Sequence, residues 1–239
     1  MGGVVKLPRE FLDWNYYPRR RLIEDLIVGG ESNLRKLLLE TMRHNPVLCT
    51  AAVGRDGRVE VNGKVVGCGY VVKREFMKEV ISALSEHLKA SDEVYEKVRG
   101  YERGMRTLWM EHAKRGAAIL LKYIYLPRGE AEKVVDFEKL ATVELAKRLP
   151  WSSKHTWNIV QRSRAACLVF YQPPAVSFEV RGTLTIHFDD EYHRLVTLIH
   201  DAYHYTPPEK RADRPVYIIH VEAVYDNSPS QRGFGTRIA

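Results

Sequence analysis

Hydrophobic residues recur every three or four positions through most of the first 135 residues, and this spacing predicts helices. The predicted helices cover residues 19–28, 34–42, 73–88 and 92–125, and the glycines inside the last range suggest an interruption there. Between the second and third helices, short apolar runs at 47–66 alternate with glycine-containing turns. Asn62-Gly63 is the strongest hairpin signal, because both residues tolerate a positive φ. We therefore expect helices around a small β-meander.

The pattern changes after residue 136. It predicts a helix at 137–149, a break at Pro150-Trp151 and a second helix that ends near residue 166. Beyond Pro173-Pro174 it predicts a strand at 177–188, a helix at 190–205 and a strand at 216–225. A right-handed crossover would make these two strands parallel in a βαβ unit. The predicted fold class is α+β, with a mainly helical region at 1–172 and the βαβ unit with its polar tail at 173–239.

Residues 136–166 resemble the general helix-turn-helix pattern of DNA-binding proteins. On the second helix of this pair, one outward face carries groups that contact phosphates or base edges: Lys154, His155, Trp157, Asn158, Gln161 and Arg162. An ordinary helical hairpin with a basic surface would show the same pattern, so both interpretations stay open at this point.

The charge is unevenly distributed along the chain. Lys and Arg total 37 against 30 Asp and Glu, which gives a formal charge of +7. Between residues 147 and 164 no acidic residue accompanies the cations, which are Lys147, Arg148, Lys154, Arg162 and Arg164. A second basic cluster, Arg19-Arg20-Arg21, follows two tyrosines. Low Asn and Gln content together with many charged residues is typical of a thermophile, so heat tolerance would explain part of the charge. A local excess of cations, by contrast, favours phosphate binding. The predicted partner is nucleic acid, with DNA favoured.

A polar face on the predicted C-terminal strands offers a second function. Alternation along the strands places Glu179, Arg181, His187, His220 and Glu222 on the side opposite the apolar residues. These groups would supply a base, an acid and an anion clamp, enough for a nuclease or for glycosidic-bond chemistry on nucleic acid. A solvated sheet face would look the same. Whether the chain is an enzyme therefore stays open.

Five of the nine histidines lie between residues 187 and 220. His200 and His204 are four residues apart on a predicted helix, a spacing that brings two imidazoles within reach of one divalent metal. No HExxH or CxxC motif accompanies them, so surface histidines are the alternative. No cofactor beyond such a metal is predicted.

The remaining composition excludes several classes. Three cysteines without a CxxC pair exclude a disulfide scaffold and a cysteine-rich zinc finger. No apolar run reaches the roughly 18 residues of a membrane span, and the N-terminus lacks the layout of a secretory signal. We expect a cytoplasmic protein without a membrane partner and allow for a homodimer. A third functional alternative is an assembly or interaction protein whose basic surface meets an acidic partner.

Overall fold

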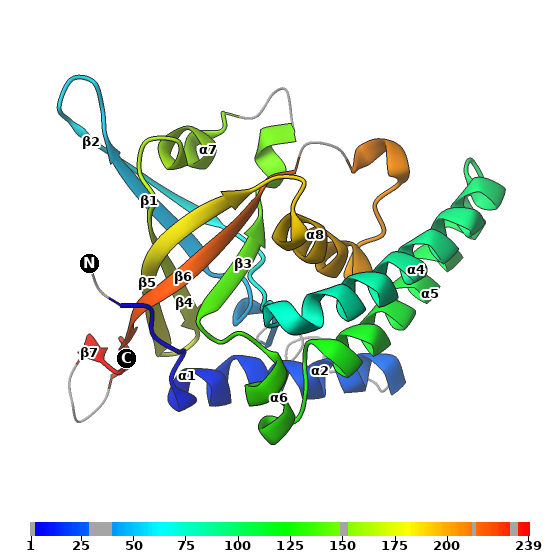
Figure 1. Cartoon of the computed structure of the whole chain (residues 1–239), viewed down its shortest axis with the longest axis horizontal. Helices are drawn as coiled ribbons and strands as arrows, with labels where there is room; N and C mark the ends of the chain where they lie inside the picture. Colours follow the sequence, from blue (N-terminus) through cyan, green and yellow to red (C-terminus); the bar gives the residue numbers. More distant parts are fainter. Residues whose placement is uncertain (1–2, 29–39, 149–152, 212–213, 230–233) are drawn as a thin grey trace.

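A computed structural model describes residues 3–28, 40–148, 153–211, 214–229 and 234–239 of the chain (Figure 1). The helices are α1 (Arg9–Trp14), α2 (Tyr16–Val28), α4 (Arg74–Val98), α5 (Glu102–Tyr123), α6 (Arg128–Val134), α7 (His155–Val160) and α8 (Glu191–Tyr203), with short 3₁₀ turns η1 (Leu145–Arg148) and η2 (Pro208–Lys210). The strands are β1 (Val47–Val53), β2 (Val59–Val65), β3 (Lys139–Val143), β4 (Ala165–Gln172), β5 (Val176–His187), β6 (Val216–Asp226) and β7 (Thr236–Arg237). The predicted α+β class is confirmed.

The strands form one antiparallel sheet in the order β2-β1-β4-β5-β6-β3, with β7 added to the end of β6. The chain after β2 turns back to the opposite edge of this order. There the Gly69 N–H donates to the Ala141 carbonyl and the Ala141 N–H donates to the Gly69 carbonyl, both at 2.9 Å. The two ends of the sheet are therefore joined, and the strands curl around an interior.

Apolar side chains fill that interior. Leu48, Phe170, Val180 and Ile219 come from four different strands and are all at most 1% exposed. Phe11 of α1 lies across one end, with its ring centroid 5.0 Å from that of Phe170. Because strand side chains alternate between the two faces, each of these inward residues has an outward neighbour that is available for other contacts.

The long helices α4 and α5 form an antiparallel hairpin that extends away from the sheet (Figure 1). Gly100, with φ of +84°, makes the turn between them. Helix α8 packs against both. At Gly116 of α5 a Cβ would lie 1.9 Å from the carbonyl oxygen of Ala202 on α8, so this pair of helices requires glycine at their contact.

The predicted helix-turn-helix at 136–166 is wrong. Residues predicted as its first helix form strand β3 and the turn η1, and the second helix is the short α7, which gives way to β4. Leu140, Ala141 and Thr142 are buried in the sheet, where β3 pairs with β6 over five residues. This pairing overrides the weak helical spacing of the segment. The predicted break at Pro150-Trp151 lies outside the described residues.

The order strand, helix, strand at the C-terminus is present, but the predicted parallel pairing is wrong. β5 and β6 are antiparallel neighbours, and α8 connects them. The connection between them, residues 188–215, is long enough for either direction, because a parallel crossover needs only about a dozen or more residues. Ten paired positions between β5 and β6 show the antiparallel arrangement.

Smaller differences concern turns and ends. Asn62-Gly63 lies inside β2, paired with Thr50 and Cys49, and the hairpin turn is made at residues 54–57 instead. Helix α4 continues past residue 88 to Val98. Pro173-Pro174, the predicted boundary between the regions 1–172 and 173–239, forms the turn between β4 and β5, so strands from both regions pair in one sheet. Most of the predicted helix at 34–42 lies outside the described residues.

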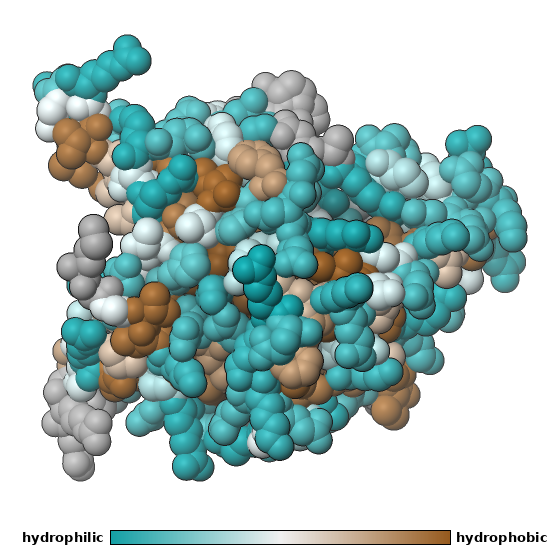
Figure 2. Space-filling view, viewed as in Figure 1, coloured by the Kyte–Doolittle hydropathy of each residue, from teal (hydrophilic) through white to brown (hydrophobic). Residues whose placement is uncertain are grey.

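The surface seen in Figure 2 is largely hydrophilic, with hydrophobic side chains in small separate groups. No helix among the described residues is long and apolar enough to cross a membrane.

Candidate functional site

Four polar residues meet on the outer face of β5 and β6. Thr185 and His187 point outward from β5 and His220 points outward from β6, while Asp190 begins α8 directly after β5. Alternation places Thr185 and His187 on the same side, opposite the fully buried Leu184. We call this set, Thr185, His187, Asp190 and His220, the imidazole face.

The imidazole face is one continuous hydrogen-bonded chain. His187 Nδ1 lies 2.7 Å from the Asp190 carboxylate, His187 Nε2 lies 2.7 Å from the Thr185 hydroxyl, and His220 Nε2 lies 3.2 Å from the same hydroxyl. An ionised carboxylate only accepts, so His187 Nδ1 carries the proton in its neutral form. His187 Nε2 then accepts from the Thr185 hydroxyl, whose oxygen accepts from His220 Nε2–H. In this arrangement the His187 imidazole can act as a base, and the His220 imidazole acts as a hydrogen-bond donor.

The local charges favour this arrangement. Burial lowers the pKa of His220, and the nearby charge of Lys139 lowers it further, so His220 stays neutral at pH 7. Lys139 sits directly opposite His220 on the neighbouring strand β3. Although partial burial opposes it, hydrogen bonds from the His193 N–H and from His187 lower the pKa of the Asp190 carboxyl. Asp190 is therefore a carboxylate at neutral pH and holds His187 in one orientation.

A pocket of about 550 Å³ lies beside the imidazole face. Lys139 and Tyr192 belong to its lining: Lys139 is the cross-strand partner of His220, and the Tyr192 ring contacts that of His187 at 5.0 Å between centroids. Its other charged lining residues include four acids and three further cations: Glu75, Glu132, Asp136, Glu138, Lys6, Lys73 and Arg74. The pocket is therefore polar, with both signs of charge.

The structure brings together part of the predicted catalytic set. His187 and His220 share the Thr185 hydroxyl, and Glu222 accepts from the neighbouring Thr183 at 2.7 Å. Glu179 and Arg181 instead form an ion pair with each other further along β5. Thr185, which links the two imidazoles, and Asp190 are not in the predicted catalytic set, although Asp190 follows His187 by only three residues.

Distance along β5 divides the predicted set: Glu179 and Arg181 alternate onto the same outward face as His187, but Arg181 lies six residues, or about 20 Å, before it. A β-bulge affects β6 instead. The pairing of β5 with β6 shifts between Arg181 and Gly182, so that Glu222 is an extra residue on β6. Simple alternation predicts Tyr225 on the apolar face. After the bulge Val224 is buried instead, and the Arg181 guanidinium lies over the outward Tyr225 ring, 4.6 Å from its centroid.

Some of the predicted nucleic-acid-binding residues around α7 form contacts with other side chains of the protein. Arg162 forms an ion pair with Glu60 of β2, and the Lys147 ammonium lies 5.2 Å from the centroid of the Trp157 ring. Lys154 is at the start of α7 with φ of 55°, in the left-handed region. The exposed members of the set are His155, Asn158, Gln161, Arg162 and Arg164. The Arg148 side chain is outside the described part.

The second basic cluster also contributes to packing. Arg19 lies with its guanidinium 5.4 Å from the centroid of the Tyr203 ring on α8. Arg20 donates to the carbonyl of Tyr125 at 2.6 Å and forms an ion pair with Glu24. Only Arg21 of the three is exposed. These contacts explain the cluster without a nucleic-acid ligand.

His200 and His204 are neighbours, with ring centroids 5.4 Å apart. The nearest carboxylate, Asp201, is held by both guanidinium nitrogens of Arg214 at 2.8 Å. Within the described residues there is no group of three or more histidine, cysteine or acidic side chains placed to hold a metal. The predicted metal pair therefore lacks further ligands in this part of the chain.

No family model and no curated protein matches the chain. Solved structures that match include an F420 reductase, 15% identical, over 77% of this chain and 92% of that one, with a TM-score of 0.35. A candidate pyridoxamine 5′-phosphate oxidase from Listeria innocua is 12% identical over 81% and 98%, with a TM-score of 0.39. A candidate 5-nitroimidazole antibiotic resistance protein from Bacteroides thetaiotaomicron is 12% identical over 81% and 82%, with a TM-score of 0.34.

These findings correct the functional prediction. The helix pair that carried the DNA-binding hypothesis is absent from the described residues, where β3 and η1 take the place of its first helix. The predictions of a DNA-binding protein, of a nucleic-acid-processing enzyme, of an assembly protein with an acidic partner and of a nucleic-acid partner are therefore wrong.

Proposed function

We propose that the chain is an enzyme that acts on a small polar molecule, with the imidazole face as its acid–base centre. The hydrogen-bonded chain Asp190–His187–Thr185–His220 carries this proposal, because it orders two imidazoles on either side of one hydroxyl. The adjoining pocket of about 550 Å³ is within the usual size range for a small-molecule site.

The chemistry follows from the polarity of the chain. His187 Nε2 takes a proton, either from the Thr185 hydroxyl or from a substrate group that replaces it, and Asp190 stabilises the imidazolium that forms. His220 Nε2–H donates to the oxygen on the other side and stabilises negative charge that develops there. Lys139, beside His220, adds a positive charge at the edge of the pocket.

Replacement of His187 by alanine tests the proposal. The protein is incubated with a mixture of small polar metabolites, and mass spectrometry follows which compounds disappear and which products form. We expect the unchanged protein to convert at least one compound. Loss of a positioned base slows such reactions by about 10²–10⁴-fold, so His187→Ala and Thr185→Val should convert that compound at least about 100 times more slowly.

His155→Ala is the matched control, because His155 is exposed on α7 and has no place on the imidazole face. It should keep the full rate. A protein that converts nothing, or a His187→Ala variant as fast as the control, would show that the imidazole face is only a hydrogen-bonded surface.

A further inference from the structure

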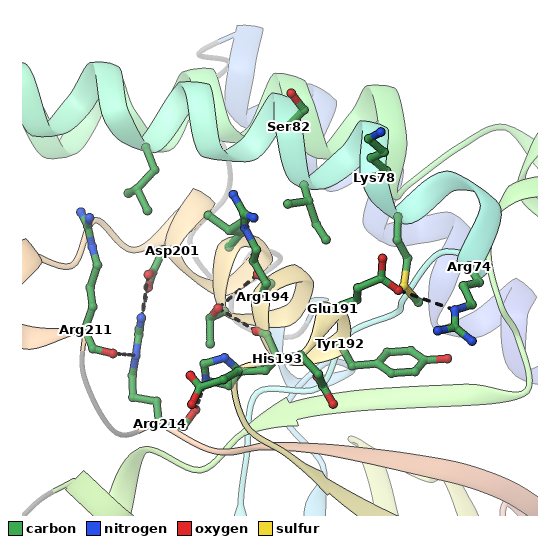
Figure 3. A pocket seen from close by; sticks show the side chains of 17 residues that line it. Arg74, Lys78, Ser82, Glu191, Tyr192, His193, Arg194, Asp201, Arg211 and Arg214 are labelled. Atoms are coloured by element: carbon green, nitrogen blue, oxygen red, sulfur yellow. Dashed lines mark hydrogen bonds and ion pairs between the residues drawn. The ribbon is translucent and has the colours of Figure 1, made fainter.

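A second cavity among the described residues lies between α4 and α8 (Figure 3), and its lining includes Asp190 of the imidazole face. Its volume of about 1110 Å³ exceeds that of the polar pocket and lies just above the usual range for ligand sites, about 300–1,000 Å³. The two helices provide its long walls. Arg211 and Arg214 lie at one end of the cavity and Arg74 at the other (Figure 3).

The floor of this α4–α8 cavity is apolar. Met77, Ile81 and Leu88 come from α4 at helical spacing, and Leu198 faces them from α8. Hydrophobic atoms are visible among hydrophilic ones where the two helices lie side by side in Figure 2. A floor of this kind favours an apolar ligand body, since burial of apolar surface contributes about 25 cal/mol per Å².

Most charged groups in the wall already have partners. Asp201 is paired with Arg214, Arg211 with Asp92 outside the cavity, and Glu191 with Arg74. Asp190 caps α8 and accepts from His187. Each of these pairs leaves little charge free for a ligand.

Asp189 is an exposed acid of the wall without an ion-pair partner among the described residues, and two cations also lack one. In the described part of the chain, neither Lys78 of α4 nor Arg194 of α8 has a carboxylate partner. Arg194 reaches from α8 toward α4, where one of its guanidinium nitrogens lies 3.4 Å from the Ser85 hydroxyl (Figure 3). An arginine that crosses the opening presents several N–H donors to an anionic group, which suits a phosphate, sulfonate or carboxylate.

From this cavity we infer a second binding site, for an amphipathic anion with an apolar body on the floor and an anionic head at Arg194 and Lys78. The site goes beyond the acid–base function, because none of the residues that hold its ligand belongs to the imidazole face. A flat aromatic body and an alkyl chain would pack equally well on the apolar floor. We therefore define the ligand only as an anion with an apolar body.

Fluorescence titration with 8-anilinonaphthalene-1-sulfonate tests this site, because the probe combines an aromatic body with a sulfonate. We expect saturable binding at one site per chain. The double variant Lys78→Ala/Arg194→Ala should bind at least about tenfold more weakly. Ser82→Trp places an indole from an exposed position into the cavity and should abolish binding. Displacement by 1-naphthyl phosphate and by dodecyl phosphate separates an aromatic from an alkyl ligand.

The matched control is Lys89→Ala/Lys97→Ala, which removes the same charge from exposed positions of α4 outside the cavity. Its affinity for the probe should equal that of the unchanged protein, and thermal unfolding should show that every variant is folded. Equal weakening in both double variants, binding that survives Ser82→Trp, or no binding at all would overturn the inference. None of these results would affect the conversion test for His187.

Discussion

Replacement of Gly182 by alanine should destabilise the protein by about 3 kcal/mol. Gly182 lies at the β-bulge, where an added Cβ would be 2.0 Å from the His220 carbonyl oxygen and 3.2 Å from a methyl group of Ile219. The oxygen belongs to the backbone of a central strand and cannot turn away as a side-chain end would. The added methyl therefore forces β5 and β6 apart, and that costs pairing along both strands.

Thermal unfolding measures the effect. For a chain of this size, about 3 kcal/mol corresponds to a Tm lower by roughly 6–12 °C. Gly69→Ala is the control, because Gly69 also pairs across strands but nothing lies within 4 Å of its Cβ position. Its stability should change by less than about 1 kcal/mol. Equal Tm values for the two variants would contradict the close approach at the bulge.

Distance along β5 determines which predicted residues form the candidate site. Alternation correctly predicts Arg181 and His187 on one outward face, because β5 itself is regular. Arg181 lies six residues, or about 20 Å, from His187, and its guanidinium lies over the Tyr225 ring instead. The bulge changes β6, where the extra residue Glu222 turns Tyr225 outward. The spacing along β5 is visible in the sequence, whereas a single extra residue in one strand has no signature in the hydrophobic pattern.

Local patterns predicted the elements whose ends carry clear signals. α2, β1, β5 and α8 occur close to the predicted ranges, and Asp190 caps α8, with its carboxylate accepting from the His193 N–H at 2.8 Å. The error at residues 137–149 has a different origin. Leu140 and its neighbours are hydrophobic at spacings compatible with helix or strand, and only pairing with β6, about 80 residues later, decides for a strand.

The same limit applies to the chemistry of the site. Lys139 lies beside His220 only because β3 pairs with β6, and Tyr192 reaches His187 only because α8 folds back after β5. Neither contact follows from spacing along the chain. The excess of cations between residues 147 and 164 predicted a phosphate-binding surface. In the structure, Arg162 instead contacts Glu60, and Lys147 contacts Trp157.

The buried ion pair between Asp201 and Arg214 should give the largest pH-dependent loss of stability. Both side chains are 3% exposed, and the two guanidinium nitrogens donate to the two carboxylate oxygens at 2.8 Å. Asp201→Asn leaves Arg214 buried without its counter-charge, which costs about 3–5 kcal/mol at pH 7. Glu191→Gln removes an exposed partner of Arg74 at 3.6 Å and should cost less than about 1 kcal/mol.

The pH dependence follows from the pKa of Asp201. Burial alone would raise it, but the hydrogen bonds from Arg214 and His200 lower the pKa to about 2. The unfolded chain has a pKa near 3.9 for this group, so it binds the proton first as the pH falls. The stabilisation is complete above about pH 5 and disappears between about pH 4 and 2. Urea unfolding at pH 7, 4 and 3 should show the difference between the unchanged protein and Asp201→Asn shrinking with acid.

A double variant separates the loss of the ion pair from the loss of packing. Asp201→Leu/Arg214→Met removes both charges and keeps apolar volume, so no buried charge is left without a partner. We expect it to be at least about 2 kcal/mol more stable than Asp201→Asn at pH 7 and to lack the loss between pH 4 and 2. If the double variant were as unstable as the single one, the cost would come from the hydrogen bonds that Asp201 accepts from His200 and Thr206, and not from the unpaired charge of Arg214.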